Sequence, residues 1–185
     1  YNNASRLTDV WPNMELFMHG GISFEPYRAQ YDAIISPGSV RYFENYNASE
    51  GYFAFQDEPE DKSMLLTLDN GVFYEFATLK ELSEAQENER PVPTRTVEEV
   101  EPGVPYAVII STTAGLWRYL IGDVVTFTSL VPHKVVISGR TQLFINAFGE
   151  ELMIGNANTA LAAACKRHNA TISDFTVAPI FIEGR

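Results

Sequence analysis

Residues 105–138 read PYAVIISTTAGLWRYLIGDVVTFTSLVPHKVVIS and contain three runs rich in β-branched and aromatic residues. The runs cover residues 105–112, 123–128 and 134–138, and turn-forming or polar residues separate them. Short runs of this composition, bounded by turn residues, are typical of neighbouring strands. We therefore predict an antiparallel sheet or a distorted barrel in the middle of the chain.

The first third of the chain predicts further strands and one helix. Residues 14–18 form a short apolar run that ends at Gly20-Gly21, as expected for a buried strand leading into a loop. A helix is expected from about Pro26 to Pro37-Gly38, because proline favours a first helical turn and Pro-Gly ends one. Residues 40–46 and 51–56 are predicted strands, and Asn47 to Glu50 form the turn between them.

The segment from residue 64 to residue 103 predicts a hairpin and then a surface excursion. Residues 64–68 and 72–76 are apolar runs separated by Asp69-Asn70-Gly71, and Asn-Gly favours a type I′ turn. Residues 80–103 are polar and acidic, with three prolines. We interpret them as a solvated surface segment with one edge strand near Thr96.

Composition changes after Arg140, which predicts a domain boundary there. Residues 149–167 combine spaced alanine and leucine residues with Lys166 and Arg167 at the end, as in a helix. Residues 175–182 are β-like. We predict one domain over residues 1–140, and a hinge followed by the start of a smaller α+β domain over residues 141–185.

Charge and cysteine content exclude several classes of function. The 185 residues carry a formal net charge of −11, which disfavours binding to nucleic acid or to an anionic membrane surface. Cys165 is the only cysteine, so neither an internal disulfide nor a cysteine zinc cluster is expected. No apolar run is long enough to span a bilayer, and we expect a cytoplasmic protein. Because the chain begins at Tyr1 without an initiator methionine, we interpret it as a fragment of a longer polypeptide.

Two strings place a carboxylate beside small turn-forming residues at the edge of a β-rich run: residues 46–51, which contain Glu50, and residues 117–124, which contain Asp123. A loop between strands is a natural position for a ligand-facing carboxylate. The alternative to a ligand contact is that Glu50 is a solvated loop residue and that Asp123 caps its own turn. Tyr46 is either a ligand-facing ring or a core aromatic, and Arg118 contacts either a phosphate or an acidic neighbour.

These strings resemble motifs of the adenylate-forming superfamily. Residues 46–50 are similar to its aromatic-x-x-Ser/Thr-Glu element, and residues 117–123 to its aromatic-Arg-x-x-Gly-Asp element. With Gly20-Gly21 upstream and residues 138–142 downstream, the motifs follow the superfamily's order. Across residues 10–13, 19–28, 46–53, 115–125 and 138–153 the chain resembles the bacterial branch of the Gretchen Hagen family of acyl acid amido synthetases.

The resemblance implies a fold, a reaction and its ligands. The implied fold is α/β (α+β): the C-terminal part of a large adenylate-forming domain with a β-rich, barrel-like subdomain, followed by the start of a small α+β domain. The implied reaction joins ATP and a small carboxylic acid into an acyl-adenylate, which the amine of an amino acid then attacks. ATP and Mg²⁺ are the implied cofactors.

Site residues are also implied by the resemblance. Glu50 is the implied catalytic residue and magnesium ligand, His19 the contact to the acyl substrate, and Gln142 the hinge. The implied ATP-binding residues are Gly20, Gly21, Tyr46, Asn47, Ala48, Ser49, Asp123 and Arg140.

Alternatives remain for these roles and for the reaction. His19 is equally well a packed structural histidine, Gly20 and Gly21 plain strand-end glycines, and Arg140 one half of a surface ion pair. An acyl-CoA ligase is the second functional hypothesis, although Gln142 and Asn146 depart from its common pattern. A binding module that keeps the fold without turnover is the third. The phosphate loop and the small-domain lysine of the family are expected outside this chain, so the isolated fragment is expected to be inactive.

Overall fold

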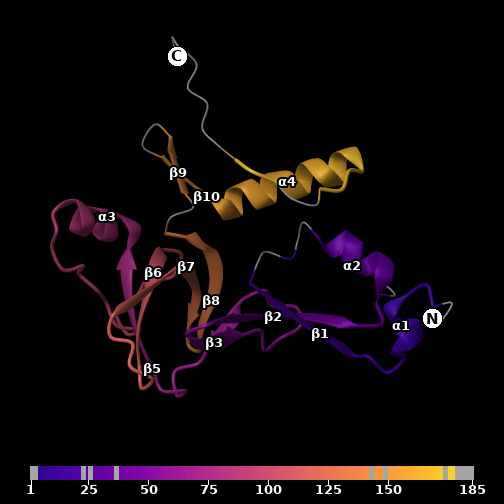
Figure 1. Cartoon of the computed structure of the whole chain (residues 1–185), viewed down its shortest axis with the longest axis horizontal. Helices are drawn as coiled ribbons and strands as arrows, with labels where there is room; N and C mark the ends of the chain where they lie inside the picture. The colour runs from indigo at the N-terminus through magenta and orange to yellow at the C-terminus, as the bar shows by residue number, and fades with distance from the viewer. Residues whose placement is uncertain are drawn as a thin grey trace, which may run out of the picture.

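A mixed sheet forms the body of the protein in the computed structural model, which describes residues 4–21, 24, 27–35, 38–141, 144–147, 150–172 and 175–177 (Figure 1). In chain order the elements are α1 (Leu7–Val10), β1 (Leu16–Gly20), α2 (Arg28–Ile34), β2 (Arg41–Ala48), β3 (Gly51–Phe55), β4 (Met64–Leu66), β5 (Val72–Thr78), α3 (Leu79–Glu87), β6 (Pro105–Thr112), β7 (Tyr119–Leu130), β8 (His133–Arg140), β9 (Phe144–Ala147), β10 (Glu150–Met153) and α4 (Ile154–His168).

The sheet has the strand order β1-β2-β3-β4-β8-β7-β6-β5. Its β1–β2 pair is parallel and its other pairs are antiparallel. The three runs predicted within residues 105–138 form β6, the middle of β7 and most of β8, and these strands are consecutive in the sheet. The prediction of an antiparallel sheet in the middle of the chain is confirmed.

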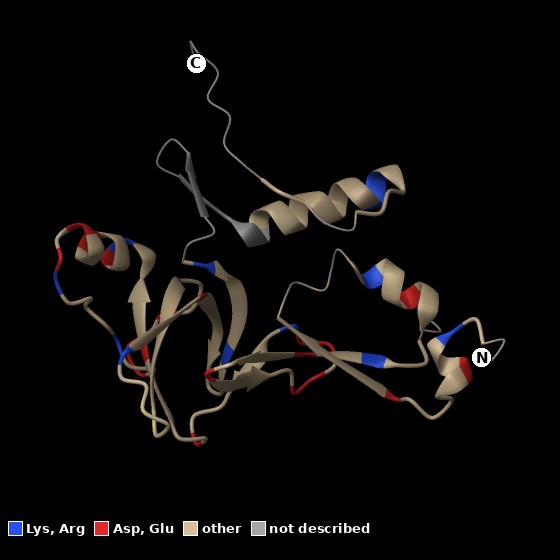
Figure 2. Ribbon diagram, viewed as in Figure 1, with Lys and Arg blue, Asp and Glu red and all other residues tan. Residues whose placement is uncertain are grey.

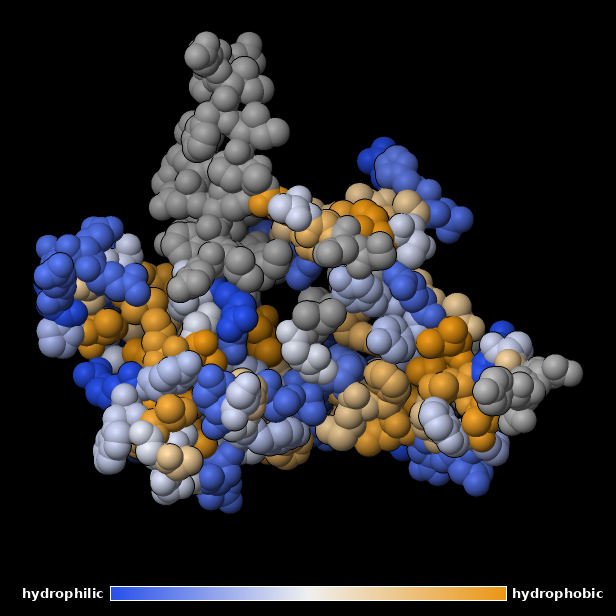
Figure 3. Space-filling model, viewed as in Figure 1, coloured by the Kyte–Doolittle hydropathy of each residue, from blue (hydrophilic) through white to orange (hydrophobic). Residues whose placement is uncertain are grey.

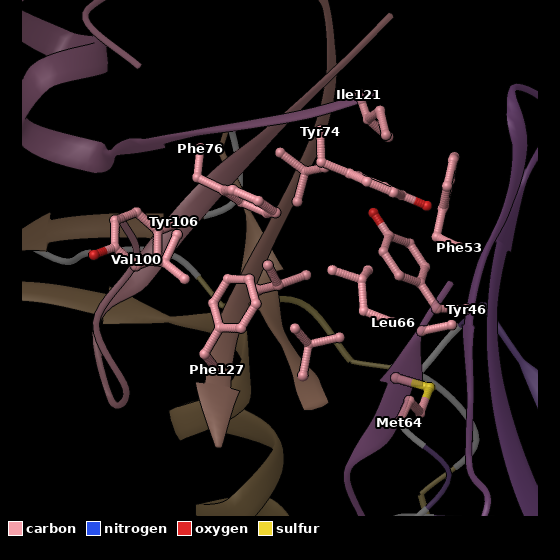
Figure 4. Packing of buried hydrophobic residues seen from close by; sticks show 14 of the residues in the cluster. Tyr46, Phe53, Met64, Leu66, Tyr74, Phe76, Val100, Tyr106, Ile121 and Phe127 are labelled. Atoms are coloured by element: carbon pink, nitrogen blue, oxygen red, sulfur yellow. The ribbon is translucent and has the colours of Figure 1, made fainter. Parts of the chain in front are cut away.

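The sheet curls strongly. Adjacent strands lie about 4.8 Å apart, so β2 and β7, four positions apart, would be separated by roughly 19 Å in a flat sheet. Instead the Tyr46 hydroxyl on β2 donates a hydrogen bond of 3.0 Å to Asp123 on β7. The concave face holds the main core, in which Phe53, Phe76 and Phe127 are almost completely buried (Figure 4). This curvature agrees with the distorted barrel expected from the sequence.

One face of the parallel β1–β2 pair is covered by α2. The ring of Phe17 on β1 lies 5.4 Å from that of Tyr31 on α2 and 5.8 Å from that of Tyr42 on β2. Leu16 and Met18 alternate with Phe17 along β1 and remain about half exposed. Figure 3 shows hydrophobic surface at this end of the molecule. The strand and helix expected here are confirmed, with β1 beginning two residues later than expected.

The hairpin predicted for residues 64–76 is wrong. β4 pairs with β3 and β8, whereas β5 pairs with β6 at the opposite end of the strand order. The side chain of Asn70 donates hydrogen bonds to the carbonyl of Tyr52 at 2.6 Å and to Thr67 Oγ1 at 2.8 Å. These bonds hold Asn70 against β3, and the segment leads the chain from β4 to β5, the last strand of the sheet order, instead of closing a tight hairpin.

The surface segment predicted for residues 80–103 is also wrong in part, because it begins with α3. Thr78 and Glu81 form a reciprocal capping box at the start of this helix, and Leu79, Leu82 and Ala85 bury its inner face. At the expected edge strand near Thr96, Arg95 forms only an isolated bridge with Phe76. Figure 2 shows the acidic residues of this region on α3 and the loop after it.

The helix predicted within residues 149–167 is confirmed as α4, which lies beside β8. The β9–β10 hairpin before it was not predicted. In the β-like run 175–182, residues 175–177 have no regular structure and the others lie outside the described residues. The division into two domains at residue 140 stays a prediction. Within the described part of the chain, no helix is both long and apolar enough to cross a membrane.

Candidate functional site

Asp123, on β7, lies at the centre of the candidate site. It is the register partner of Arg140 on β8, and Arg140 Nε lies 3.1 Å from Asp123 Oδ1. The other oxygen, Oδ2, accepts the hydrogen bond of 3.0 Å from the Tyr46 hydroxyl. The structure therefore brings together three residues that the sequence analysis had assigned to ATP binding from separate motifs.

Local geometry explains why Asp123 faces these partners. Gly122 has a φ of +91°, in the left-handed region that favours glycine, and it lies where the β6–β7 register shifts. A bulge of this kind redirects the next side chain. Beyond Arg140, the backbone N–H of Thr141 donates to the Gly122 carbonyl at 2.8 Å and extends the β7–β8 pairing. Asp123 is thus held on a rigid part of the sheet.

Half of the acceptor capacity of Asp123 remains available. A carboxylate offers about four lone-pair sites, and Tyr46 and Arg140 occupy one on each oxygen. The Asp123 side chain is 16% exposed and that of Arg140 is 56% exposed. Among the described residues, no backbone N–H of its own turn donates to Asp123, so the turn-capping alternative is not what the structure shows. The remaining lone pairs suit a ligand that presents two adjacent hydroxyl donors.

Tyr46 is part of the core. It is 3% exposed, and its ring lies 4.9 Å from that of Phe53. Burial, together with the negative charge of Asp123, raises the pKa of the Tyr46 hydroxyl far above its usual range. The hydroxyl therefore remains protonated and acts as a donor. Of the two roles considered for Tyr46, this arrangement favours the core aromatic over a ring that stacks on a ligand.

Glu50 lies in the two-residue turn between β2 and β3, where Ala48 and Gly51 are register partners. It is half-buried, and within the described part of the chain its carboxylate makes no hydrogen bond or ion pair. Asn47, after a register shift at the end of β2, and Ser49 are exposed. The expected turn is present, but it is two residues shorter than predicted, because β2 continues through Asn47 and Ala48.

A metal at Glu50 would need ligands from its substrate. Mg²⁺ is commonly bound by one or two carboxylates together with phosphate oxygens and waters. The described residues contain no group of three or more His, Cys, Asp or Glu side chains that could hold a metal ion. Within the described part of the chain, a magnesium ion at Glu50 would therefore need phosphate oxygens and waters to complete its ligands.

Gly20 is explained by packing. It ends β1 opposite Asn45, the residue before Tyr46, and a Cβ atom on Gly20 would clash with the Asn45 side chain and lie 2.5 Å from the Asn45 carbonyl oxygen. Gly21 has a φ of +87° and open space around it. The strand-end alternative therefore accounts for Gly20, and Gly21 lies in an open loop beside it.

His19 lies on the covered face of β1. Its ring stacks on Phe24 with centroids 4.2 Å apart, and its Nδ1 is buried without a hydrogen-bond partner among the described residues. Burial, with a smaller contribution from the positive charge of Arg28, lowers the pKa of His19. The His19 ring is therefore packed against the protein, as the structural alternative proposed. Its described surroundings contain no feature that identifies an acyl substrate.

Arg118 pairs with an acidic neighbour, which is one of the two alternatives considered for it: its Nε lies 3.1 Å from Glu75 Oε2. Gln142, the expected hinge, lies outside the described residues. Asn146 belongs to β9.

A shallow cavity of about 340 Å³ is lined by Phe55, residues 65–69, Pro132 and His133, at the opposite end of β8 from Arg140.

The connection between these residues was not predicted. Tyr46 was considered either as a ligand-facing ring or as a core aromatic, and neither alternative included the contact of its hydroxyl with Asp123. No local signal predicts this contact, because the two residues lie 77 positions apart.

Comparisons with known proteins agree with this architecture. Residues 65–140 match the family model described as the GH3 family central domain, where GH3 stands for Gretchen Hagen. The structure is similar to "GH3.15 acyl acid amido synthetase", with a TM-score of 0.67 and 18% identity over 92% of this chain and 30% of that chain. It is also similar to "AtGH3.15 acyl acid amido synthetase in complex with 2,4-DB", with a TM-score of 0.67 and 18% identity over 92% of this chain and 29% of that chain.

A third similar structure is the amide bond synthetase McbA from Marinactinospora thermotolerans, with a TM-score of 0.45 and 12% identity over 79% of this chain and 35% of that chain. The two GH3.15 structures show that the α+β fold is shared, and the family-model match supports the GH3 family. This chain spans about 30% of the length of those two structures.

Proposed function

We propose that this chain is part of a GH3-family ligase, which uses ATP to activate a carboxylic acid as an acyl-adenylate and transfers the acyl group to the amine of an amino acid. The observation that carries the proposal is the Tyr46–Asp123–Arg140 cluster, because it joins motifs from distant parts of the sequence around one half-satisfied carboxylate. Two members of the cluster lie within the segment that matches the GH3 central domain.

In this proposal Asp123 binds the ribose of ATP. Each carboxylate oxygen has a lone pair left to accept a hydrogen bond from one ribose hydroxyl, while Arg140 and Tyr46 keep the carboxylate oriented. The exposed guanidinium of Arg140 also has N–H groups with which to contact ribose or phosphate oxygens. Hydrogen bonds to a charged acceptor are stronger than neutral ones, so this contact contributes substantially to ATP affinity.

Glu50 binds the magnesium ion that accompanies the phosphates. Bound Mg²⁺ supplies positive charge that offsets the negative charge of the triphosphate as the acid approaches. The position of Glu50 in an open turn, without a protein partner among the described residues, leaves its carboxylate available for this role. Ser49 lies in the same turn and Asn47 and Ala48 end the strand before it, and these three residues are the proposed neighbours of the nucleotide.

The proposed chemistry has two steps. A carboxylate oxygen of the acid attacks the α-phosphorus of ATP, an acyl-adenylate forms and pyrophosphate leaves. The amine of an amino acid then attacks the acyl carbonyl, an amide forms, AMP leaves and the amine loses a proton. His19 is proposed to lie near the acyl group and Gln142 to act as the hinge between the steps. Because the chain spans about 30% of the matched structures, we propose that it is inactive by itself.

Pyrophosphate exchange by the complete protein tests this proposal. Exchange of label from pyrophosphate into ATP, dependent on both Mg²⁺ and a carboxylic acid drawn from a panel, is the expected result. Formation of an amide with amino acids would separate an amido synthetase from an acyl-CoA ligase, which would instead use coenzyme A. No exchange with any acid, together with retained nucleotide binding, would favour a binding module and contradict the proposal.

A further inference from the structure

We propose that Tyr46 is a positioning residue whose hydroxyl fixes Asp123 for ribose binding and ties the turn that carries Glu50 to the strand that carries Asp123. This inference rests on the proposed function, because it assigns Tyr46 a part in the same nucleotide site.

Asp123 is held from two directions. Arg140 approaches Oδ1 from the adjacent strand β8, where register places the two residues opposite each other. Tyr46 approaches Oδ2 from β2, across the concave face of the sheet. A carboxylate restrained on both oxygens has a fixed plane, so its free lone pairs point in fixed directions. Removing either restraint allows the carboxylate to rotate about its Cβ–Cγ bond.

The Tyr46 restraint is rigid. The side chain is almost fully buried and packs against Phe53, so its ring cannot move without disturbing the core. The raised pKa of the hydroxyl keeps it protonated, and it therefore donates to the carboxylate throughout the working pH range. A buried donor to a charged acceptor forms a stronger hydrogen bond than an exposed donor, because water does not compete for the donor.

The same bond connects the two halves of the proposed site. Tyr46 lies on β2, and Glu50 lies in the turn at the end of that strand. Asp123 belongs to β7, four positions away in the sheet order. The Tyr46 hydroxyl thus links the element proposed to meet the metal-bound phosphates to the strand proposed to meet the ribose.

Tyr74 offers a matched control in the same core. It is 4% exposed and belongs to the same hydrophobic cluster as Tyr46. Figure 4 shows the two hydroxyls turned toward one another. The Tyr74 hydroxyl is near Thr67 and Asn70 but makes no hydrogen bond of good geometry within the described part of the chain. Tyr74→Phe therefore removes the same atom from the same core without releasing Asp123.

The experiment compares ATP with 2′,3′-dideoxy-ATP in the complete protein. The ratio of the two kcat/KM values in pyrophosphate exchange is measured for the wild type, Tyr46→Phe and Tyr74→Phe, at a temperature at which all three are folded. The wild type is expected to prefer ATP. Tyr46→Phe is expected to reduce this preference by about 10-fold, the order of one hydrogen bond to a charged group. Tyr74→Phe is expected to leave the preference unchanged.

Each outcome distinguishes this inference from the function on which it rests. If the wild type shows exchange and prefers ATP but Tyr46→Phe keeps the same preference, the positioning role is wrong and the proposed function stands. An equal loss with both nucleotides indicates a purely structural tyrosine and also overturns the inference. So does a Tyr46→Phe variant that fails to fold while Tyr74→Phe folds. Absence of exchange in the wild type would instead overturn the proposed function.

Discussion

Arg140 and Asp123 face each other across the β7–β8 ladder, with Arg140 Nε 3.1 Å from Asp123 Oδ1. Each residue directly follows a glycine, Gly139 and Gly122. Two glycine-containing motifs that are separate in the sequence are therefore one structural unit. Most of the Arg140 side chain remains exposed in this pair. Arg140 can therefore orient Asp123 and also contact a ligand.

Asp123→Ala is expected to weaken ATP binding more than binding of the carboxylic acid. The substitution removes two proposed hydrogen bonds from the ribose hydroxyls, each worth roughly 1.5–3 kcal/mol. Isothermal titration of the complete protein with ATP, with 2′,3′-dideoxy-ATP and with the acid measures the effect. ATP should lose much more affinity than the dideoxy analogue, and equal losses would remove Asp123 from the ribose site.

Glu50→Gln is expected to reduce magnesium-dependent pyrophosphate exchange on the order of 10²-fold. Stability should change little, because the Glu50 side chain has no partner among the described residues. Glu60→Gln, in the exposed loop before β4, is the matched control and should have normal exchange. A Glu50→Gln protein with an unchanged exchange rate and unchanged magnesium dependence would show that this carboxylate is a solvated turn residue.

Gly20→Ala is expected to destabilise the protein by about 1–3 kcal/mol, because the new Cβ would overlap the backbone of Asn45 on the neighbouring strand. Gly21→Ala meets no neighbouring atom and should lose only about 1 kcal/mol, from its left-handed φ. Urea unfolding of the two variants measures the difference. A smaller loss for Gly20→Ala than for Gly21→Ala would mean that β1 and β2 separate easily at this point.

Glu81 is expected to make stability depend on acid. Its hydrogen bonds with Arg95 are the largest cause that lowers the pKa of Glu81 to about 2. A carboxylate with a lowered folded-state pKa stabilises the protein above its unfolded pKa of about 4.3, and this stabilisation is lost as pH falls toward 2. Glu81→Gln keeps the capping-box pattern but removes the charge.

The difference in unfolding free energy between wild type and Glu81→Gln should therefore be about 1–2 kcal/mol at neutral pH, and it should decrease as pH falls below about 4.3 and disappear as pH falls through 2. Thermal unfolding between these pH values measures it. Glu84→Gln is the control on the same helix, since Glu84 forms ion pairs of 3.5 and 3.8 Å with exposed Arg90 and Lys80. A pH-independent difference for Glu81→Gln would contradict the assignment.

Strands whose partners are close in the sequence were predictable. β6, β7 and β8 follow one another along the chain and in the sheet, so composition and turn residues were sufficient. The predicted Asn-Gly hairpin was wrong because β4 pairs with β8 and β5 pairs with β6, and both partners lie later in the sequence. Helix α3 was missed although Thr78 and Glu81 form a capping box that the sequence displays. The acidic composition of this segment favoured a solvated loop, and the apolar stripe that α3 buries is short.

The residues of the candidate cluster could be named from the sequence, but their arrangement could not. The resemblance to adenylate-forming motifs assigned Asp123, Arg140 and Tyr46 to ATP binding, and the structure brings the three side chains together. Their contacts depend on the curl of the sheet and on the bulge at Gly122, which no local pattern encodes. For the same reason, neither alternative considered for Tyr46, a ligand-facing ring or a core aromatic, included the contact of its hydroxyl with Asp123.

The pairing of β4 with β8 has a consequence for synthesis on the ribosome. Met64 pairs with Val135, so the partner of β4 is translated 71 residues later. At ordinary rates of elongation this delay is roughly 4–14 s. During that interval β3 and β4 have emerged with one edge unpaired, an arrangement prone to association with other chains. We therefore expect the nascent protein to bind chaperones most strongly before β8 leaves the exit tunnel, and ribosome profiling of chaperone-bound nascent chains would locate that window.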